Sequence, residues 1–294
     1  MELVIRHLSK TYANGVKALQ DVSLHIRTGM FGLLGPNGAG KSTLMRILAT
    51  LQEPDSGEAF LGPHNILTQK AEIRTMLGYL PQEFGVYPRI SAEVLLDHLA
   101  ILKGVTAKGE RKALVEALLQ RTNLWEHRRK HLGGYSGGMR QRFGIAQALI
   151  ANPRLIIVDE PTAGLDPAER NRFHNLLSEL GEQAVVILST HIVDDVKELC
   201  TDMAIINQGR ILMNGNPLQA IESLGGRVWR KRVPKDELEA YKQQFTVISD
   251  KLISGQPQIH VLSDTQPDAS FQAVEAELED VYFSHILQSQ LVPA

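Results

Sequence analysis

The chain has 294 residues, of which 43% are apolar, and its 31 Lys and Arg against 33 Asp and Glu leave a formal charge of −2. A single core seldom grows beyond about 250 residues, so this length favours one large domain and a smaller one. The near-neutral charge excludes an overall basic field that would hold nucleic acid. The single cysteine, Cys200, excludes an internal disulfide and is expected to be inert core in a reducing compartment. Because no apolar run approaches the ~20 residues of a membrane span, we expect the chain itself to be soluble.

The first predicted elements are strands. Residues 3–28 alternate apolar and polar side chains, which is typical of edge strands in an antiparallel layer. Residues 31–34 predict a short buried strand, and residues 43–48 predict the start of a helix. The loop between this strand and this helix carries the first chemical motif.

That loop reads Gly-Pro-Asn-Gly-Ala-Gly-Lys-Ser-Thr, which is the phosphate-binding (Walker A) pattern. Its glycines let successive backbone N–H groups point at an anion. Lys41 offers a charge to the β- and γ-phosphates of a nucleotide, and the Ser42 hydroxyl can ligate Mg²⁺. A merely structural glycine turn is the alternative, but a strand before the loop and a helix after it favour a nucleoside triphosphate site. The predicted nucleotide contacts are Gly35, Asn37, Gly38, Ala39, Gly40, Lys41, Ser42 and Thr43.

The elements that follow predict a sheet flanked by helices. Residues 57–80 indicate a strand and a short helix, and apolar side chains at three- and four-residue spacing predict helices over residues 91–150. The continuous apolar runs 155–158 and 184–188 are typical of strands buried on both faces of a parallel sheet. One more strand and a hairpin turn are predicted over residues 203–213.

Two carboxylates, Asp159 and Glu160, end the first of these apolar runs. Beside the phosphate loop, Asp159 would hold Mg²⁺ through water, and Glu160 would sit where an attacking water must lose a proton. Acids at strand ends are often helix caps, and this is the competing interpretation. Two consecutive carboxylates at the rim of a phosphate site favour the catalytic one.

A second anion-binding corner is predicted at Ser136-Gly137-Gly138, which opens a helix. Ser136 is a good N-cap, and Met139, Phe143, Ala146 and Ile150 would form the apolar stripe of that helix. A capped helix start with two glycines exposes backbone N–H groups to an anion. Alone, it would be an ordinary helix N-terminus.

In this order the motifs resemble the nucleotide-binding subunit of an ABC transporter, over residues 3 to about 220. The resemblance implies an α/β fold, with a P-loop NTPase (ABC ATPase) core, an antiparallel β subdomain and a helical subdomain over about 88–152. The nucleotide-binding domain would cover residues 1–222, and a small C-terminal α+β domain residues 223–294.

The resemblance also implies roles for further residues. Tyr12 matches the aromatic residue that stacks on adenine, and His191 matches the switch histidine that contacts the γ-phosphate and supports Glu160. Gln82 matches the Q-loop glutamine, which reaches toward Mg²⁺ and lies beside the contact with the membrane subunit. Residues 163–166, which end at Asp166, match the D-loop. Met139 departs from the family pattern, which has glutamine there, and residues 29–32 are one residue shorter than the pattern; neither change removes a phosphate contact.

The partners implied by the resemblance are a second ABC subunit and separate permease subunits. Ser136 and Gly138 of one copy would complete the ATP site of the other, so that two ATP molecules with Mg²⁺ hold a two-fold dimer, expected to be a homodimer. Hydrolysis would open that dimer and drive the permease. The subunit would lie at the cytoplasmic face of the cell (inner) membrane, attached through the permease, with no nucleic acid partner.

The C-terminal segment differs in character from the rest. A basic cluster at residues 227–232 is followed by a predicted helix, two short strands and an acidic helix near residues 275–280. The cluster is interpreted as a solvated strand face, with a contact to a partner chain or lipid head groups as the alternative. Residues 277–283 resemble the ending of the type 2 exporter branch, which predicts export.

Two other classes of protein compete with a transporter subunit. A soluble ABC ATPase acting on ribosomes or DNA would share the motifs, but such translation factors carry two cassettes, DNA-repair relatives insert a long coiled coil, and the charge does not favour nucleic acid. A nucleotide kinase or GTPase would share the phosphate loop alone and leaves Gln82, Ser136 and His191 unexplained. The transported substrate is not encoded in any of these motifs.

Overall fold

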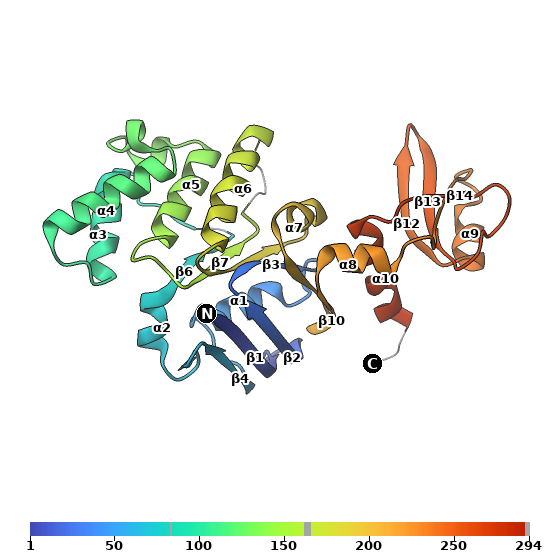
Figure 1. Cartoon of the computed structure of the whole chain (residues 1–294), viewed down its shortest axis with the longest axis horizontal. Coiled ribbons are helices and arrows are strands. Elements are labelled where there is room, and N and C mark those ends of the chain that lie inside the picture. Colours follow the sequence, from blue (N-terminus) through green and yellow to red (C-terminus); the bar gives the residue numbers. More distant parts are fainter. Residues whose placement is uncertain (83, 162–165, 292–294) are drawn as a thin grey trace.

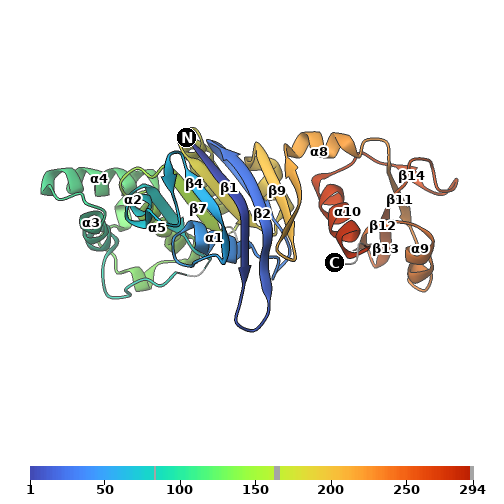
Figure 2. The same ribbon diagram turned by 90° about the horizontal axis from the view of Figure 1, so that it is seen from below.

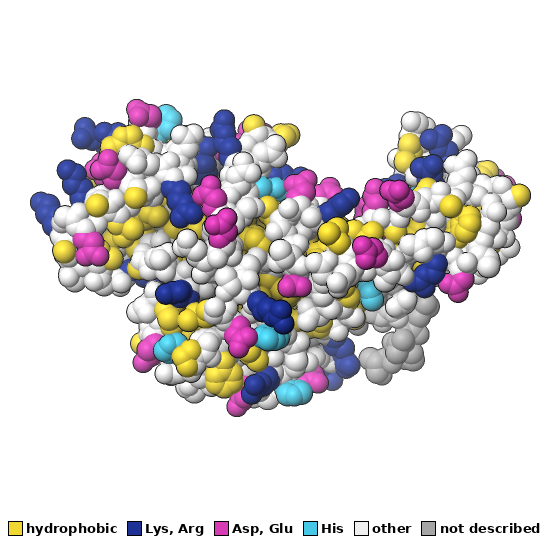
Figure 3. Space-filling model, in the orientation of Figure 1, with side chains coloured by type: hydrophobic (Ala, Val, Ile, Leu, Met, Phe, Trp, Pro, Cys, Tyr) yellow, Lys and Arg dark blue, Asp and Glu magenta, His cyan; other side chains and the backbone are white. Residues whose placement is uncertain are grey.

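A computed structural model describes residues 1–82, 84–161 and 166–291. The molecule is elongated, with a large body that carries a helical lobe at one end and a small sheet at the other (Figure 1). Figure 3 shows a hollow between the small sheet and the large body, and acidic and basic side chains are mixed over the face in view. Among the described helices, none is both long and apolar enough to cross a membrane.

The central sheet has the strand order β10-β9-β3-β8-β7-β6. All but β10 run parallel, and β10 pairs antiparallel with β9 through the predicted hairpin, in which Gln208 and Gly209 have positive φ. The predicted apolar strands are confirmed as buried members of this sheet. The strands of this sheet are β3 (Gly29–Leu34), β6 (Leu77–Leu80), β7 (Leu155–Asp159), β8 (Val185–Thr190), β9 (Asp202–Asn207) and, partly exposed at one edge, β10 (Arg210–Gly215).

A core lies on each face of this sheet, because alternate side chains of a strand point to opposite faces. Leu155 and Ile157 of β7 face an antiparallel sheet and helix α1 (Lys41–Leu48), whereas Ile156 and Val158 face the helical side. The antiparallel sheet has the order β2-β1-β4-β5. Its strands are β1 (Glu2–Thr11), β2 (Lys17–Arg27), β4 (Ser56–Leu61) and β5 (His64–Asn65). Residues 3–28 form an antiparallel pair as predicted, but of these two strands only β2 is an edge strand, because β1 also pairs with β4.

The helical lobe follows the predicted spacing. Helix α2 (Lys70–Met76) precedes β6, and the lobe itself consists of α3 (Ala92–Leu102), α4 (Lys108–Arg121) and α5 (Gly137–Ala148) with short 3₁₀ turns between α4 and α5. Phe143 of α5 is fully buried in the same core as the helical face of β7. Two further helices, α6 (Pro167–Gly181) and α7 (Val193–Leu199), cover that face beside α5 (Figure 1). Cys200, predicted as core, is buried directly after α7, and burial raises the pKa of its thiol.

The C-terminal segment forms a sheet of order β12-β13-β11-β14, with α9 on one face. The basic cluster lies on β11: Arg230 and Arg232 share one face, while Lys231 lies over the rings of Tyr241 and Phe271 on the other. The predicted helix and two strands are confirmed, and the structure adds the short β14. Bounds are α8 (Pro217–Ser223), β11 (Val228–Arg232), α9 (Leu238–Gln244), β12 (Val247–Ile253), β13 (Gln256–Leu262), β14 (Gln272–Ala273) and α10 (Leu278–Leu291).

Helix α10 returns from the small sheet to the large body. It begins at Leu278, so Glu275 and Glu277 precede the predicted acidic helix rather than lie in it. Figure 2 shows α10 between β9 and the small sheet, and the amide of Asn207 on β9 donates to the Ser289 hydroxyl at 3.0 Å. The first turn of α10 is held by Asp280, which accepts the N–H of Glu277 at 2.9 Å and contacts His260 Nδ1 at 2.8 Å.

Asp280→Ala should lower the free energy of unfolding by about 2 kcal/mol, because it removes a buried charged partner of His260 and the N-terminal support of α10. Urea denaturation measures this loss. Glu279→Ala is the matched control, since its half-buried carboxylate pairs with Lys251 and such a pair is worth about 0.5 kcal/mol. Equal losses for the two variants would contradict the anchoring role of Asp280.

Candidate nucleotide-binding site

The loop from Gly35 to Thr43 joins the end of β3 to α1 and has little room for side chains. Gly38 and Gly40 have φ of +80° and +108°, a left-handed conformation that disfavours other residues. A Cβ on Gly40 would lie 2.3 Å from the carbonyl oxygen of Ala18, and one on Gly35 would lie 2.4 Å from that of Ile206. These contacts force glycine at both places and leave a backbone concavity suited to phosphate.

Lys41 is buried at the centre of this loop. Its Nζ donates to the carbonyl oxygen of Gly35 at 2.7 Å and to that of Pro36 at 3.3 Å, and it lies 3.7 Å from Glu160 Oε1. Burial lowers the pKa of Lys41, and the carboxylates of Glu160 and Asp159 oppose that shift only in part. The ammonium group is therefore incompletely compensated, and a bound polyphosphate would supply the missing negative charge.

Asp159 ends β7 and is 4% exposed. Burial raises the pKa of this carboxyl, while the nearby hydroxyls of Ser189 and Ser42 act in the opposite direction. Among the described residues, Asp159 Oδ1 has no hydrogen-bond partner. A buried carboxylate oxygen without a partner, beside a serine hydroxyl, suits a hydrated divalent cation.

The carboxylate of Glu160 contacts two further side chains of this site, those of Gln82 and His191. Gln82 Nε2 donates to Glu160 Oε2 at 3.0 Å, and His191 Nδ1 lies 3.2 Å from Glu160 Oε1. Its backbone has φ of +47°, an uncommon conformation for a non-glycine residue, and its N–H donates to the carbonyl oxygen of Ser189 at 2.8 Å. Gln82, Glu160 and His191 follow β6, β7 and β8, so parallel strands bring them to one edge of the sheet.

Tyr12 lies over the first turn of α1. Its hydroxyl is 3.0 Å from Thr43 Oγ1 and also contacts the amide of Gln52. Around it, Asn37, Gly38 and Ser42 are exposed along the loop, while Ala39 is buried. The structure thus brings Tyr12 to the phosphate loop without any sequence proximity, and its contact with adenine stays a prediction.

The Ser136 corner lies apart from this group. Ser136 caps α5, with its hydroxyl accepting the N–H of Met139 at 3.2 Å, and Gly137 is exposed. Asp166 caps α6 by accepting the N–H of Glu169 at 2.8 Å. Over residues 1–82, 84–161 and 166–291, no hydrogen bond or ion pair joins Ser136, Gly137, Gly138 or Asp166 to the phosphate loop. Residues 163–165 of the predicted D-loop lie outside the described residues.

A buried charged cluster was missed by the sequence interpretation. Asp195 of α7 is fully buried and is 2.7 Å from Arg170 and 2.9 Å from His174, both on α6. The signal in the sequence is the spacing of Arg170 and His174, which places both side chains on one helix face. That face meets α7 only in the folded protein, so their acidic partner could not be read from the sequence.

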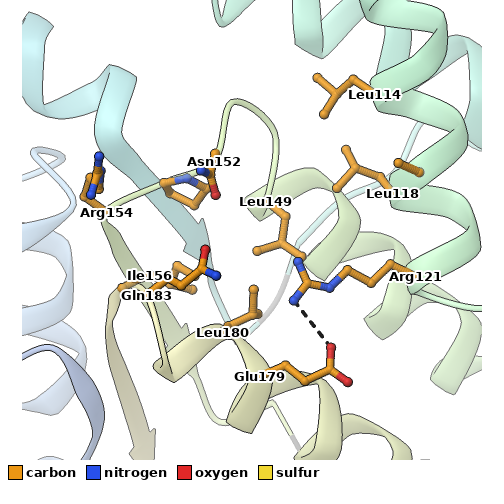
Figure 4. A pocket seen from close by; sticks show the side chains of 13 residues that line it. Leu114, Leu118, Arg121, Leu149, Asn152, Arg154, Ile156, Glu179, Leu180 and Gln183 are labelled. Atoms are coloured by element: carbon orange, nitrogen blue, oxygen red, sulfur yellow. Dashed lines mark hydrogen bonds and ion pairs between the residues drawn. The ribbon is translucent and has the colours of Figure 1, made fainter.

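A crevice of about 590 Å³ lies between α4 and α6 (Figure 4). Leu114, Leu118 and Leu180 line it, and Arg121 crosses it to Glu179 at 3.4 Å. Arg154 and Ala184 place it at the amino ends of β7 and β8. Ligands of such sheets bind at the carboxyl ends of the strands, so this crevice is not the nucleotide site.

Comparisons with known proteins show which family the chain resembles. The family model described as "ABC transporter" matches residues 19–163. The chain is 39% identical to the ABC transporter ATP-binding protein NatA of Bacillus subtilis over 71% of this chain and 84% of NatA. It is 32% identical to the daunorubicin/doxorubicin resistance ATP-binding protein DrrA of Streptomyces peucetius, over 89% and 77%. A solved dimeric ATP-binding cassette in a post-hydrolysis state with ADP and Pi is 27% identical, with a TM-score of 0.66 over 73% of this chain and 98% of that chain.

Asp159→Asn should raise the melting temperature of the nucleotide-free protein by about 2 °C at pH 7. The reason is that burial disfavours the ionised form of the Asp159 carboxyl, and the substitution replaces this carboxyl with a neutral amide. The pKa of Asp159 is raised on folding, so the folded protein binds more protons than the unfolded chain in the window above the ordinary carboxyl pKa of 3.8. Wild-type stability therefore falls as pH rises through that window, and the gain should vanish below it.

Thermal melting across pH measures this difference. Asp194→Asn, at an exposed carboxylate on α7, is the matched control and should leave the melting temperature within about 1 °C. A lower melting temperature for Asp159→Asn at pH 7 would contradict the electrostatic account of this site.

Proposed function

Because the chain belongs to the family of ABC transporter ATP-binding proteins, we propose that it is the energy-coupling subunit of a membrane exporter. The chain is an ABC ATPase with ATP as its nucleotide. The observation that carries the assignment of the catalytic residues is the meeting of Lys41, Gln82 and His191 at Glu160. These side chains come from the phosphate loop and from the ends of three neighbouring strands.

The loop amides and Lys41 bind the β- and γ-phosphates of ATP. Lys41 exchanges the carbonyl oxygens of Gly35 and Pro36 for phosphate oxygens, which relieves the cost of its burial. Ser42, Gln82 and, through water, Asp159 would hold Mg²⁺, which neutralises charge on the phosphates. Tyr12 stacks on the adenine beside α1.

Glu160 acts as the general base. Its carboxylate takes a proton from the water that attacks the γ-phosphorus as the bond to the β-phosphate oxygen breaks. His191, 3.2 Å from Glu160, orients that carboxylate and contacts the γ-phosphate. The left-handed backbone at Glu160 supports this role, because such strain is retained where the side chain must point in one direction.

A second copy of the chain completes each ATP site. Support comes from the separation of the Ser136 corner from the phosphate loop of the same chain, and from the capped, exposed start of α5. Ser136, Gly137 and Gly138 of one copy bind the γ-phosphate held by the other, with Asp166 near the interface. Hydrolysis removes a group that both copies bind, so the two-fold dimer opens.

Separate permease subunits dock on an apolar groove of about 290 Å³ between α3 and the end of α1. Leu51 and Leu102 on its rim are 64% and 82% exposed, which is unusual for large apolar side chains unless a partner covers them. Tyr79 of β6 also lines the groove and lies three residues before Gln82, so docking there is adjacent to the nucleotide. The likeness to DrrA and to the exporter ending at residues 277–283 supports export. The subunit would lie at the cytoplasmic face of the membrane, attached through the permease.

Glu160→Gln should lower the ATPase rate by about 10²–10⁴-fold, because the amide cannot take the proton from water. The same variant should accumulate an ATP-bound dimer, since hydrolysis is what opens it. Phosphate release measures the rate, and size-exclusion chromatography with MgATP measures the dimer.

Lys41→Ala separates binding from chemistry in the same assays. It should abolish the ATP-dependent rise in melting temperature that Glu160→Gln retains. Full ATPase activity in Glu160→Gln would remove Glu160 as the base, and dimers of Lys41→Ala with ATP would remove the nucleotide as the link between copies.

Leu102→Glu should abolish co-purification with a multi-span membrane protein from solubilised membranes, while the ATPase rate of the isolated subunit stays within about twofold. Leu252→Glu is the matched control, because Leu252 is 68% exposed on the C-terminal sheet, away from the groove. Unchanged co-purification of Leu102→Glu would place the permease contact elsewhere.

A further inference from the structure

Two neighbouring residues of α6 make ion pairs to different helices. Arg142 of α5 lies 2.9 Å from Glu169, and their side chains are only 12% and 18% exposed. Arg170 lies 2.7 Å from Asp195 of α7, which is fully buried. Helices α5, α6 and α7 lie side by side over the central sheet (Figure 1), so α6 is joined on both sides.

The Glu169 side of this arrangement reaches the Ser136 corner. A Cβ on Gly138 would lie 3.1 Å from the carboxylate of Glu169, and the N–H of Glu169 donates to Asp166. Gly138 and Glu169 are therefore neighbours, so a shift of the start of α5 would change the space around this carboxylate. In the proposed dimer, the phosphate that the Ser136 corner binds belongs to the ATP of the other copy.

The ion pair of Arg170 with Asp195 connects α6 to residues 190–192, which contain His191. Asp195 Oδ2 lies 3.5 Å from the hydroxyl of Thr190, and that hydroxyl accepts the N–H of Ile192 at 3.0 Å. These contacts bracket His191 on both sides along the chain. His174 holds Asp195 from α6 as well, with its second ring nitrogen 3.0 Å from Glu198.

Buried ion pairs transmit position because separating them exposes an uncompensated charge to a low dielectric. Arg170 and His174 of α6 both contact Asp195 of α7. A shift of α6 would therefore displace α7 or separate these buried charges. The contacts of Asp195 to Arg170, His174 and Thr190 connect α6 with the segment that carries His191. The effect of Asp195 on the reaction would act through Thr190 and His191.

We propose that Glu169 and Asp195 are positioning residues, joined through α6, that let the occupancy of the Ser136 corner set the position of His191. The ATP bound by one copy would then set the position of His191 in the copy whose Ser136 corner contacts that ATP. Hydrolysis at the two sites of the dimer would thereby be coupled. This inference rests on the proposed function, because it needs a dimer whose copies share ATP.

A double-mutant cycle in the ATPase rate tests this link. Glu169→Gln and Asp195→Asn should each lower kcat by about tenfold with KM for ATP within about twofold, because the ion pairs that they remove join α5, α6 and α7 and not the phosphate loop. If both act through α6, the double variant should be no slower than the slower single variant. Glu179→Gln is the matched control on α6, since its exposed ion pair joins α6 to Arg121 of α4, and it should leave kcat unchanged.

Several results would overturn the link. Unchanged kcat in either single variant, or effects that multiply in the double variant, would mean that the two ion pairs act locally. If Asp195→Asn does not fold, Arg170→Lys replaces it in the cycle, because it keeps the charge but loses the planar fork. A wild-type protein without ATP hydrolysis would refute the proposed function instead, so the two failures are distinguishable.

Discussion

The structure depends on a buried carboxylate held against a buried ammonium group at the end of one strand. Lys41 and Glu160 are 3.7 Å apart, and both side chains are at most 10% exposed. Both groups are held at a cost in free energy, since burial lowers the pKa of Lys41 and the backbone at Glu160 is left-handed. Such an arrangement is stable only if the surrounding sheet over-determines it.

The parallel sheet supplies that rigidity. Strands β6, β7 and β8 are neighbours, and they end at the same edge of the sheet. Glu160 follows β7, and Gln82 and His191, which follow β6 and β8, both contact its carboxylate. Both faces of β7 are covered, so its end cannot move without disturbing one core or the other. The glycines of the phosphate loop complete the arrangement by letting the backbone pass within van der Waals distance of its neighbours.

Three further features of the surface lie outside this site. The Ser136 corner, the apolar groove at Leu102 and the C-terminal sheet lie on different parts of the surface, and α10 fastens that sheet to the large body next to α7. A small pocket between α7 and α10 includes His191, Asp194 and Tyr282. The C-terminal segment therefore lies next to His191 and packs against the large body.

The sequence by itself determined the class of fold and predicted which residues form the candidate site. Motifs such as residues 35–43 and the acids after β7 are local, because the turn or strand that displays them is encoded by the same few residues, and their spacing was enough for the family. Only the tertiary structure decided that Gln82 donates to Glu160, that Tyr12 reaches Thr43, and that Asp195 meets Arg170 and His174. It also showed that Glu275 and Glu277 precede α10 and that α10 packs back on the cassette. Contacts of this kind join segments far apart in the chain, and they are selected by the packing of both cores together, which no local pattern contains.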